Sequence, residues 1–215
     1  MPIETKICGL RDPAAVDAAV QGGAALVGFV FHAKSPRNLT PQAAATLAAR
    51  VPAGVRRVGL LVDEGDDRIA EILAAAPLDM LQLHGDETPE RVAAIKQRFG
   101  KPVMKAVAIA EAADLDRAAR YLASADRLLF DAKLPASMTG APPGGNALAF
   151  DWRLIAGRDW PLPWMLAGGL NAGNLAEAVR ISGARRVDVS SGVEDRPGVK
   201  NPKKITAFLA LAATL

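Results

Sequence analysis

A thiol and a carboxyl group stand at the ends of two short apolar segments of this 215-residue sequence. Cys8 ends the segment Thr5–Cys8, and Asp131 ends the segment Arg127–Asp131. A thiolate can remove a proton and a carboxylic acid can donate one, so the pair is suited to general acid–base catalysis. Each residue also has a structural alternative, because a lone cysteine is often a small buried hydrophobe and an aspartate often caps a loop.

Lys6 stands two residues before Cys8. In a strand, this spacing places both side chains on the same side. If that side faces the protein interior, the ammonium would lower the thiol pKa from its usual value of about 8.5 toward a usable thiolate. We therefore predict that Cys8 is a general base and that Asp131 is a general acid.

Two further segments suggest an anion site. Gly168-Gly169 and Ser190-Ser191-Gly192 each follow an apolar run. Glycines let backbone N–H groups approach an anion closely, and serines add hydroxyl donors. Ordinary tight turns would explain either segment alone, but the pair together favours phosphate binding.

Arg37 and His84 are further candidates for contact with a substrate. Arg37 lies in the Pro-stiffened run Ser35-Pro36-Arg37 and could bind a carboxylate through two hydrogen bonds; its alternative is a solvated surface residue. His84 would either orient a substrate or be a histidine at a strand end whose hydrogen bonds are satisfied within the protein. Two histidines and one cysteine show no metal-ligand spacing, and no nucleophile elbow is present, so we expect neither a metal site nor a hydrolytic triad.

Short β-branched segments alternate with Ala-rich segments of helical period. The predicted strands are Thr5–Cys8, Leu26–Phe31, Arg57–Val62, Met80–Leu83, Val103–Val107, Arg127–Asp131, Pro163–Ala167 and Arg186–Ser190. The predicted helices are Asp12–Gly22, Pro41–Val51, Asp66–Ala75, Pro89–Phe99, Glu111–Leu122, Phe150–Ala156, Ala172–Ser182 and Pro202–Ala213. The irregular segment Ala132–Ala147 is long enough to be functional or disordered.

Regular alternation of this kind predicts parallel strands joined by crossover helices. An open doubly wound sheet would usually carry a glycine-rich dinucleotide fingerprint after its first strand, and Cys8-Gly9-Leu10-Arg11-Asp12 lacks it. We therefore expect an α/β fold, a (β/α)₈ TIM barrel, with residues 1–215 as a single domain. In such barrels the active site lies at the C-terminal ends of the strands, where the candidates above cluster.

Composition narrows the partners and the compartment. The net charge is +3, and Lys and Arg are scattered while only one Tyr is present, so a nucleic-acid interface is not expected. One cysteine cannot form an internal disulfide, and no apolar run is long enough to span a membrane. We expect a cytoplasmic protein, monomeric or homodimeric, with a small phosphorylated molecule as its partner.

Seven motifs together resemble the phosphoribosylanthranilate isomerase family. They are Lys6-Ile7-Cys8-Gly9-Leu10, Ser35-Pro36-Arg37, Gln82-Leu83-His84-Gly85, Leu129-Phe130-Asp131, Phe150-Asp151-Trp152, Leu166-Ala167-Gly168-Gly169-Leu170 and Asp188-Val189-Ser190-Ser191-Gly192-Val193-Glu194. The match runs in order along nearly the whole chain. The combination of the cysteine in the first strand, the aspartate in the sixth strand and the last motif is specific for this family.

The resemblance implies an Amadori rearrangement without a metal or organic cofactor. N-(5-phosphoribosyl)anthranilate would become 1-(2-carboxyphenylamino)-1-deoxyribulose 5-phosphate, with Asp131 protonating the ring oxygen and Cys8 removing the C2 proton. Arg37 would hold the anthranilate end and Asp188 a sugar hydroxyl. The phosphate would be held by Gly168, Gly169, Ser190, Ser191 and Gly192.

Two segments depart from the family pattern. Gly144-Gly145-Asn146-Ala147 stands where the family usually has Gly-Gly-Thr-Gly, after a long Lys133–Pro143 stretch. Asn201 stands where the family commonly has Asp, which bears on the cap of the last helix.

Rival functions fall into three classes: another phosphate-binding barrel enzyme, a barrel that binds without catalysis, and a nucleic-acid-binding protein. The related sugar isomerase of histidine biosynthesis has an aspartate where Cys8 stands, and indoleglycerol-phosphate synthase needs a lysine and glutamate set that is not found here. A barrel that only binds a phosphorylated metabolite or a protein predicts binding without turnover. A nucleic-acid-binding protein predicts salt-sensitive binding to DNA or RNA.

Overall fold

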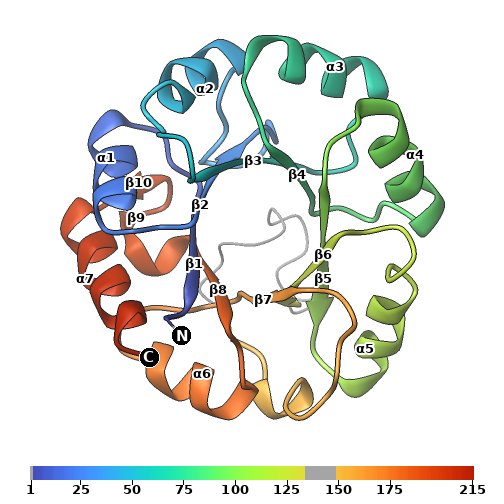
Figure 1. Cartoon of the computed structure of the whole chain (residues 1–215), viewed down its shortest axis with the longest axis vertical. Coiled ribbons are helices and arrows are strands. Elements are labelled where there is room, and N and C mark those ends of the chain that lie inside the picture. Colours follow the sequence, from blue (N-terminus) through green and yellow to red (C-terminus); the bar gives the residue numbers. More distant parts are fainter. Residues whose placement is uncertain (1, 134–148) are drawn as a thin grey trace.

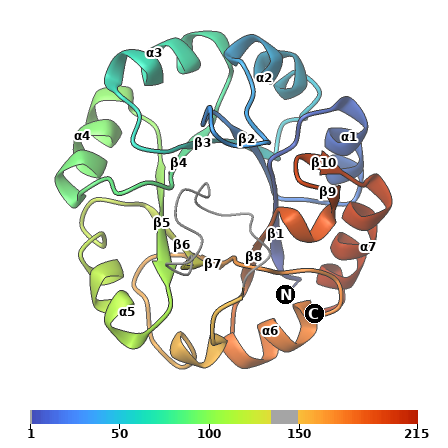
Figure 2. The same cartoon turned by 180° about the vertical axis from the view of Figure 1, so that it is seen from behind.

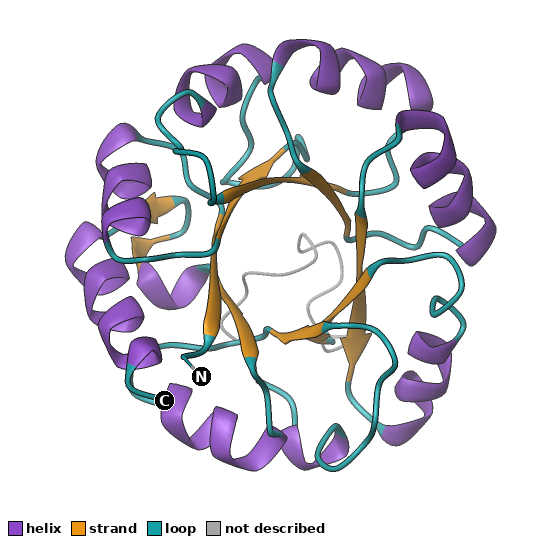
Figure 3. Cartoon of the chain, in the orientation of Figure 1, coloured by secondary structure: helices purple, strands orange, loops and turns teal. Residues whose placement is uncertain are grey.

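The computed structural model describes residues 2–133 and 149–215. Eight parallel strands pair in chain order, and β8 pairs with β1, so the sheet closes into a barrel. The strands form a central ring and the helices lie outside it (Figures 1 and 3). This is the predicted (β/α)₈ TIM barrel.

The elements begin and end within a few residues of their predicted limits. The barrel strands are β1 Glu4–Cys8, β2 Leu26–Val30, β3 Arg56–Leu61, β4 Met80–Leu83, β5 Val103–Ile109, β6 Arg127–Ala132, β7 Trp164–Leu166 and β8 Arg186–Val189. The helices are α1 Pro13–Gln21, α2 Pro41–Ala48, α3 Asp66–Ala75, α4 Pro89–Phe99, α5 Ala112–Ala119, α6 Leu175–Ser182 and α7 Pro202–Ala213.

Capping residues explain where several helices begin. The side chains of Asp12, Thr40 and Thr88 each accept a hydrogen bond from the backbone of the first turn, and each is followed by a proline. At the start of α7, Asn201 accepts from the N–H groups of Lys203 and Lys204. The departure from Asp to Asn therefore leaves the cap in place.

Two parts of the fold differ from the sequence expectation. The predicted helix Phe150–Ala156 is wrong: the structure has only the short 3₁₀ helix η2, Trp152–Leu154, because Asp151 caps a single turn. After β8 the chain forms a second 3₁₀ helix, η3 Ser191–Val193, and an antiparallel hairpin of β9 Glu194–Arg196 and β10 Val199–Lys200, which we did not predict. Seen from both sides, this hairpin lies outside the barrel beside α1 (Figures 1 and 2).

Among the described residues, the buried apolar side chains form three clusters. Apolar side chains between strands and helices form the larger cluster, which includes Phe29, Phe130 and Phe208. A second cluster fills the barrel interior, with Leu26, Val58, Met80, Met104, Ala106, Leu129, Met165 and Ala167. Cys8, Val30 and Leu60 form a small cluster of their own. Filled barrels of this type leave only the strand ends open for a site.

Candidate active site

Cys8 is the last residue of β1 and is buried. As alternation predicted, Lys6 lies on the same side of the strand. Its fully buried ammonium donates to Asp188 Oδ1 at 3.0 Å, and its charge also acts on the Cys8 thiol. Asp188 comes from β8, the neighbour of β1. The base candidate, Lys6 and Asp188 thus form one buried group.

Gly28 on β2 makes the space for this group. It pairs with Cys8, and a Cβ added at Gly28 would lie 2.9 Å from Cys8 Sγ and 3.2 Å from Lys6 Nζ. Contacts this short would force the neighbours to move, so only glycine leaves both side chains in place. Sequence reasoning missed this residue, although a glycine inside the apolar strand Leu26–Val30 is a recognised sign of close approach.

Burial outweighs the expected effect of Lys6 on the pKa of the Cys8 thiol, although Lys6 itself lowers that pKa as predicted. Burial raises the pKa of the Cys8 thiol above its ordinary value, and the opposing attraction of Lys6 does not overcome it. Asp188 adds to the rise, because it is a negative charge that also pairs with Lys6. The pKa of Lys6 itself is raised despite its burial, because of Asp188 and Cys8. Cys8 is therefore a stronger base than an ordinary thiolate, but it is ionised less often at neutral pH.

Asp131 lies in β6 and is buried beside His84, the residue after β4. His84 Nε2 lies 3.1 Å from Asp131 Oδ2, and His84 Nδ1 lies 2.9 Å from Nε2 of the fully buried Gln82. The N–H of Ala132 donates to Asp131 Oδ1 at 2.8 Å. His84 and the Ala132 N–H thus contact the two carboxylate oxygens of Asp131. Gln82 in turn contacts the other ring nitrogen of His84.

The two loops of the expected phosphate site lie against each other. Gly168 and Gly169 have φ values of 82° and 64°, a region that favours glycine. Gly192 packs so closely on the carbonyl of Leu170 that a Cβ there would overlap it. Ser190 donates from Oγ to the carbonyl of Cys8 at 3.2 Å. The structure therefore brings both predicted loops together, next to Cys8.

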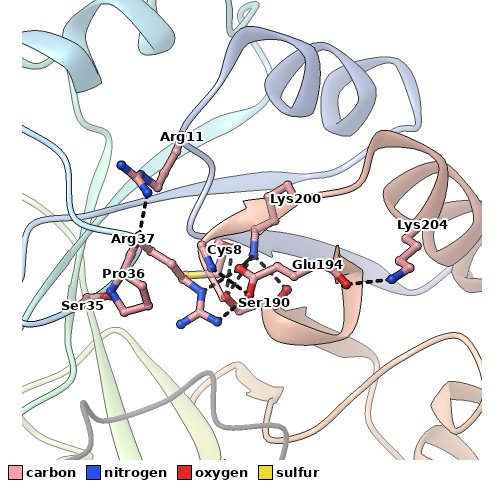
Figure 4. Close-up of polar contacts among 10 residues, drawn as sticks. Cys8, Arg11, Ser35, Pro36, Arg37, Ser190, Glu194, Lys200 and Lys204 are labelled. Atoms are coloured by element: carbon pink, nitrogen blue, oxygen red, sulfur yellow. Dashed lines mark hydrogen bonds and ion pairs between the residues drawn. The ribbon is translucent and has the colours of Figure 1, made fainter. Parts of the chain in front are cut away.

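Arg37 is not a solvated surface residue, because only 5% of it is exposed. Its Nε and Nη2 donate to the two carboxylate oxygens of Glu194, each at 2.7 Å. Lys200 Nζ lies 2.7 Å from Glu194 Oε1 (Figure 4). Burial alone would raise the pKa of Glu194, but hydrogen bonds from Arg37 and the charge of Lys200 hold it below its usual range. Sequence reasoning missed the roles of Glu194 and Lys200.

A cavity of about 610 Å³ opens at the end of the barrel where the candidate acid lies. His84, Asp131 and Lys105 line it, while Cys8 does not. Lys105 is engaged there, since its Nζ lies 2.7 Å from Glu87 Oε2 in a buried pair. Within residues 2–133 and 149–215, no cluster of three or more metal-binding side chains occurs, and no helix is long and apolar enough to cross a membrane.

The predicted loop Ala132–Ala147, with its Gly144–Ala147 run, falls almost entirely outside the described residues, which stop at Lys133 and resume at 149. The remaining candidates place a thiol, a carboxyl group and two close glycine-containing loops at the C-terminal strand ends of one barrel. Fold and site together define a (β/α)₈ barrel whose strand ends carry groups suited to acid–base catalysis and loops suited to an anion.

Comparisons with known proteins identify the family. The model of the N-(5'-phosphoribosyl)anthranilate isomerase family matches residues 5–210. The N-(5'-phosphoribosyl)anthranilate isomerase of Rhodospirillum centenum is 60% identical over 215 residues, which is 100% of both chains. The chain belongs to the N-(5'-phosphoribosyl)anthranilate isomerase family.

Solved structures agree with this assignment. Phosphoribosyl anthranilate isomerase from Thermotoga maritima has a TM-score of 0.86 and 34% identity, with 99% of this chain and 100% of that chain covered. A second such structure contains reduced 1-(o-carboxyphenylamino)-1-deoxyribulose 5-phosphate; it has a TM-score of 0.82 and 32% identity, with the same coverage.

Proposed function

We propose that Cys8 and Asp131 are the base and the acid with which this chain isomerises N-(5'-phosphoribosyl)anthranilate, an aldose–ketose isomerisation of tryptophan biosynthesis. The observation that carries the assignment is the burial of one thiol and one carboxyl group at the same end of a closed barrel. Each has a polar partner beside it: the charge of Lys6 acts on the thiol, and His84 Nε2 lies within hydrogen-bond distance of the carboxyl.

The reaction consists of proton transfers. Protonated Asp131 gives its proton to the furanose ring oxygen, the bond between that oxygen and C1 breaks, and the anthranilate nitrogen forms a Schiff base with C1. The Cys8 thiolate then takes the proton from C2, which leaves an enolamine. Tautomerisation of the enolamine then moves the enol proton from the C2 oxygen to C1 and gives the ketone. Exchange with solvent takes the proton from Cys8 and returns one to Asp131, which restores both groups. Groups positioned for such transfers contribute about 10²–10⁴-fold each.

His84 supports the acid step in this scheme. When Asp131 gives up its proton, a carboxylate forms in a buried place, and a donor on that carboxylate favours its formation. His84 Nε2 is within reach of Oδ2, and the Ala132 N–H already donates to Oδ1. We therefore assign His84 to Asp131, in addition to the substrate contact expected from the sequence.

The remaining candidates hold the substrate. We assign the phosphate to the two loops after β7 and β8, whose backbone is close-packed at Gly192, and the anthranilate carboxylate to Arg37. Asp188 would contact a sugar hydroxyl while it holds Lys6 at 3.0 Å. The phosphate residues are Gly168, Gly169, Ser190, Ser191 and Gly192.

The assignment is tested by the decay of substrate fluorescence, with indoleglycerol-phosphate synthase added to remove the product. Purified wild-type protein is compared with Cys8→Ala and Asp131→Ala. We expect rapid decay with the wild type and a loss of at least about 10²-fold in each variant, with circular dichroism unchanged. Substrate binding without turnover by the wild type would favour the purely binding barrel instead.

The setting of the enzyme follows from the same assignment. We propose that residues 1–215 act as one domain in the cytoplasm, without a metal or organic cofactor, on a small phosphorylated substrate and not on nucleic acid or a membrane. Monomer and homodimer are both compatible with a site built from one chain. One structural relative is described as monomers of the dimeric phosphoribosylanthranilate isomerase from Thermotoga maritima. Sedimentation of the purified chain would decide the assembly.

A further inference from the structure

Lys200 is a buried cation to which the catalytic scheme has given no task. It lies at the end of the β9–β10 hairpin, and its side chain is 0% exposed. Burying a charged ammonium costs free energy unless partners compensate for the lost water. A lysine placed so deeply beside an active site therefore calls for a physical reason.

All three N–H bonds of the ammonium have acceptors within reach. Lys200 Nζ lies 2.7 Å from Glu194 Oε1, 2.8 Å from the carbonyl of Ser190 and 3.2 Å from Ser190 Oγ. Ser190 Oγ in turn donates to the carbonyl of Cys8 at 3.2 Å. A continuous path of hydrogen bonds thus runs from Lys200 through Ser190 to Cys8 (Figure 4).

The hairpin is fixed on its other side to the loop that carries Arg37. A Cβ added at Gly198 would lie 2.5 Å from the carbonyl of Pro36, and Arg11 donates to that same carbonyl at 2.7 Å. The Gly198 N–H donates to Glu194 at 3.2 Å. The hairpin that carries Lys200 therefore contacts the loop after β2, and this contact restricts movement of Lys200 away from Ser190.

The charges in this cluster do not cancel. Arg37 and Lys200 are cations and Glu194 is the single anion between them, so the three sum to +1. Lys6 and Asp188 form a separate, neutral pair. A buried excess of positive charge favours an anion nearby. The proposed reaction has two anions in this region, the Cys8 thiolate and the phosphate of the bound substrate.

We propose that Lys200 is a positioning residue for the isomerisation, which holds Ser190 in place for the phosphate and supplies positive charge that favours the Cys8 thiolate. The inference rests on the proposed roles of Cys8 and of the loop after β8. It goes beyond them because Lys200 acts through Ser190 and through its charge, and not by contact with the reacting atoms.

The test uses the fact that Cys8 is the only cysteine of the chain. The pH titration of thiolate absorbance, with a Cys8→Ser protein as blank, reports the Cys8 pKa without any turnover. The variants are Lys200→Met, which removes the charge and keeps an unbranched side chain, and Lys203→Met as the matched control. Lys203 is exposed, and none of its side-chain atoms makes a hydrogen bond or ion pair with another described residue.

For folded Lys200→Met we expect the titration midpoint to rise, because a positive charge that lowers the pKa of the Cys8 thiol is lost. We also expect KM to rise at least about tenfold, with the alkaline shift repeated in the pH profile of kcat/KM. Lys203→Met should match the wild type in all three. Should Lys200→Met not fold, Lys200→Gln takes its place, because it also removes the charge and keeps a polar end for Glu194 and Ser190.

An unchanged midpoint and KM in a folded Lys200→Met or Lys200→Gln protein would overturn the proposal. These outcomes are separate from failure of the proposed function. If Cys8→Ala retained full turnover, the role of Cys8 as base would fall, whereas the thiol titration would still report whether Lys200 acts on Cys8.

Discussion

Replacing Gly28 with alanine is predicted to disable the base without removing a catalytic group. The added Cβ would lie 2.9 Å from Cys8 Sγ. Ordinary contact between such atoms begins at about 3.5 Å, so the sulfur must move by roughly 0.6 Å or the strands must part. A misplacement of about 1 Å can cost about 10²-fold in rate, so we expect kcat/KM to fall by roughly 10- to 100-fold. Overpacking should also cost about 1–3 kcal/mol of unfolding free energy.

Gly59→Ala is the matched control for this change. Gly59 lies in the neighbouring strand β3, but a Cβ there would meet Leu78 Cδ1 at 2.5 Å, on the helix side of the barrel and away from Cys8. It should lose a similar amount of unfolding free energy, measured by urea denaturation, and keep the wild-type kcat/KM in the fluorescence assay. Equal losses of activity in both variants, or full activity in Gly28→Ala, would refute the reasoning.

Three further predictions concern the titrating groups. Because burial raises the pKa of the Cys8 thiol and a base must be ionised, kcat/KM should rise with pH through neutrality; a profile already flat at pH 6 would contradict this. His84→Ala should lower kcat by about tenfold or more with a smaller change in KM, since it supports Asp131; a pure KM effect would return His84 to substrate binding. Ionised Glu194 should stabilise the fold above its unfolded pKa of about 4.3, and this stability should vanish as acid titrates the lowered folded pKa. Between pH 5 and about pH 3, the free energy of unfolding measured with urea should therefore fall less in Glu194→Gln than in the wild type.

The barrel could be predicted because its sequence signals are local. Strand and helix periods, and the caps Asp12, Thr40 and Thr88, depend on residues within one turn of each other. The helix predicted at Phe150–Ala156 was wrong because packing on the rest of the fold, and not local spacing, determines this segment. Its apolar spacing is compatible with a helix, but only three residues form one, and partly buried Trp152 and Leu154 instead pack on the core.

The candidate site was only partly predictable. Strand ends and alternation correctly brought Lys6 and Cys8 together, because both rules are geometric. The direction of the Cys8 pKa shift could not be read in the same way, since it depends on how far burial outweighs the attraction of nearby cations, of which Lys6 is already paired with Asp188. The contact between Arg37 and Glu194 joins residues that are 157 positions apart, and no local pattern marks such a pair.

The central claim, that Cys8 takes the proton from C2, is tested most directly by a single turnover of substrate that carries deuterium at C2. We predict that deuterium slows the turnover by the wild-type enzyme, because the C–H bond breaks at the base. Cys8→Ala should be at least about 10²-fold slower than the wild type with either substrate, although it still binds both. A Cys8→Ala protein that turns over the substrate at the wild-type rate would contradict the account.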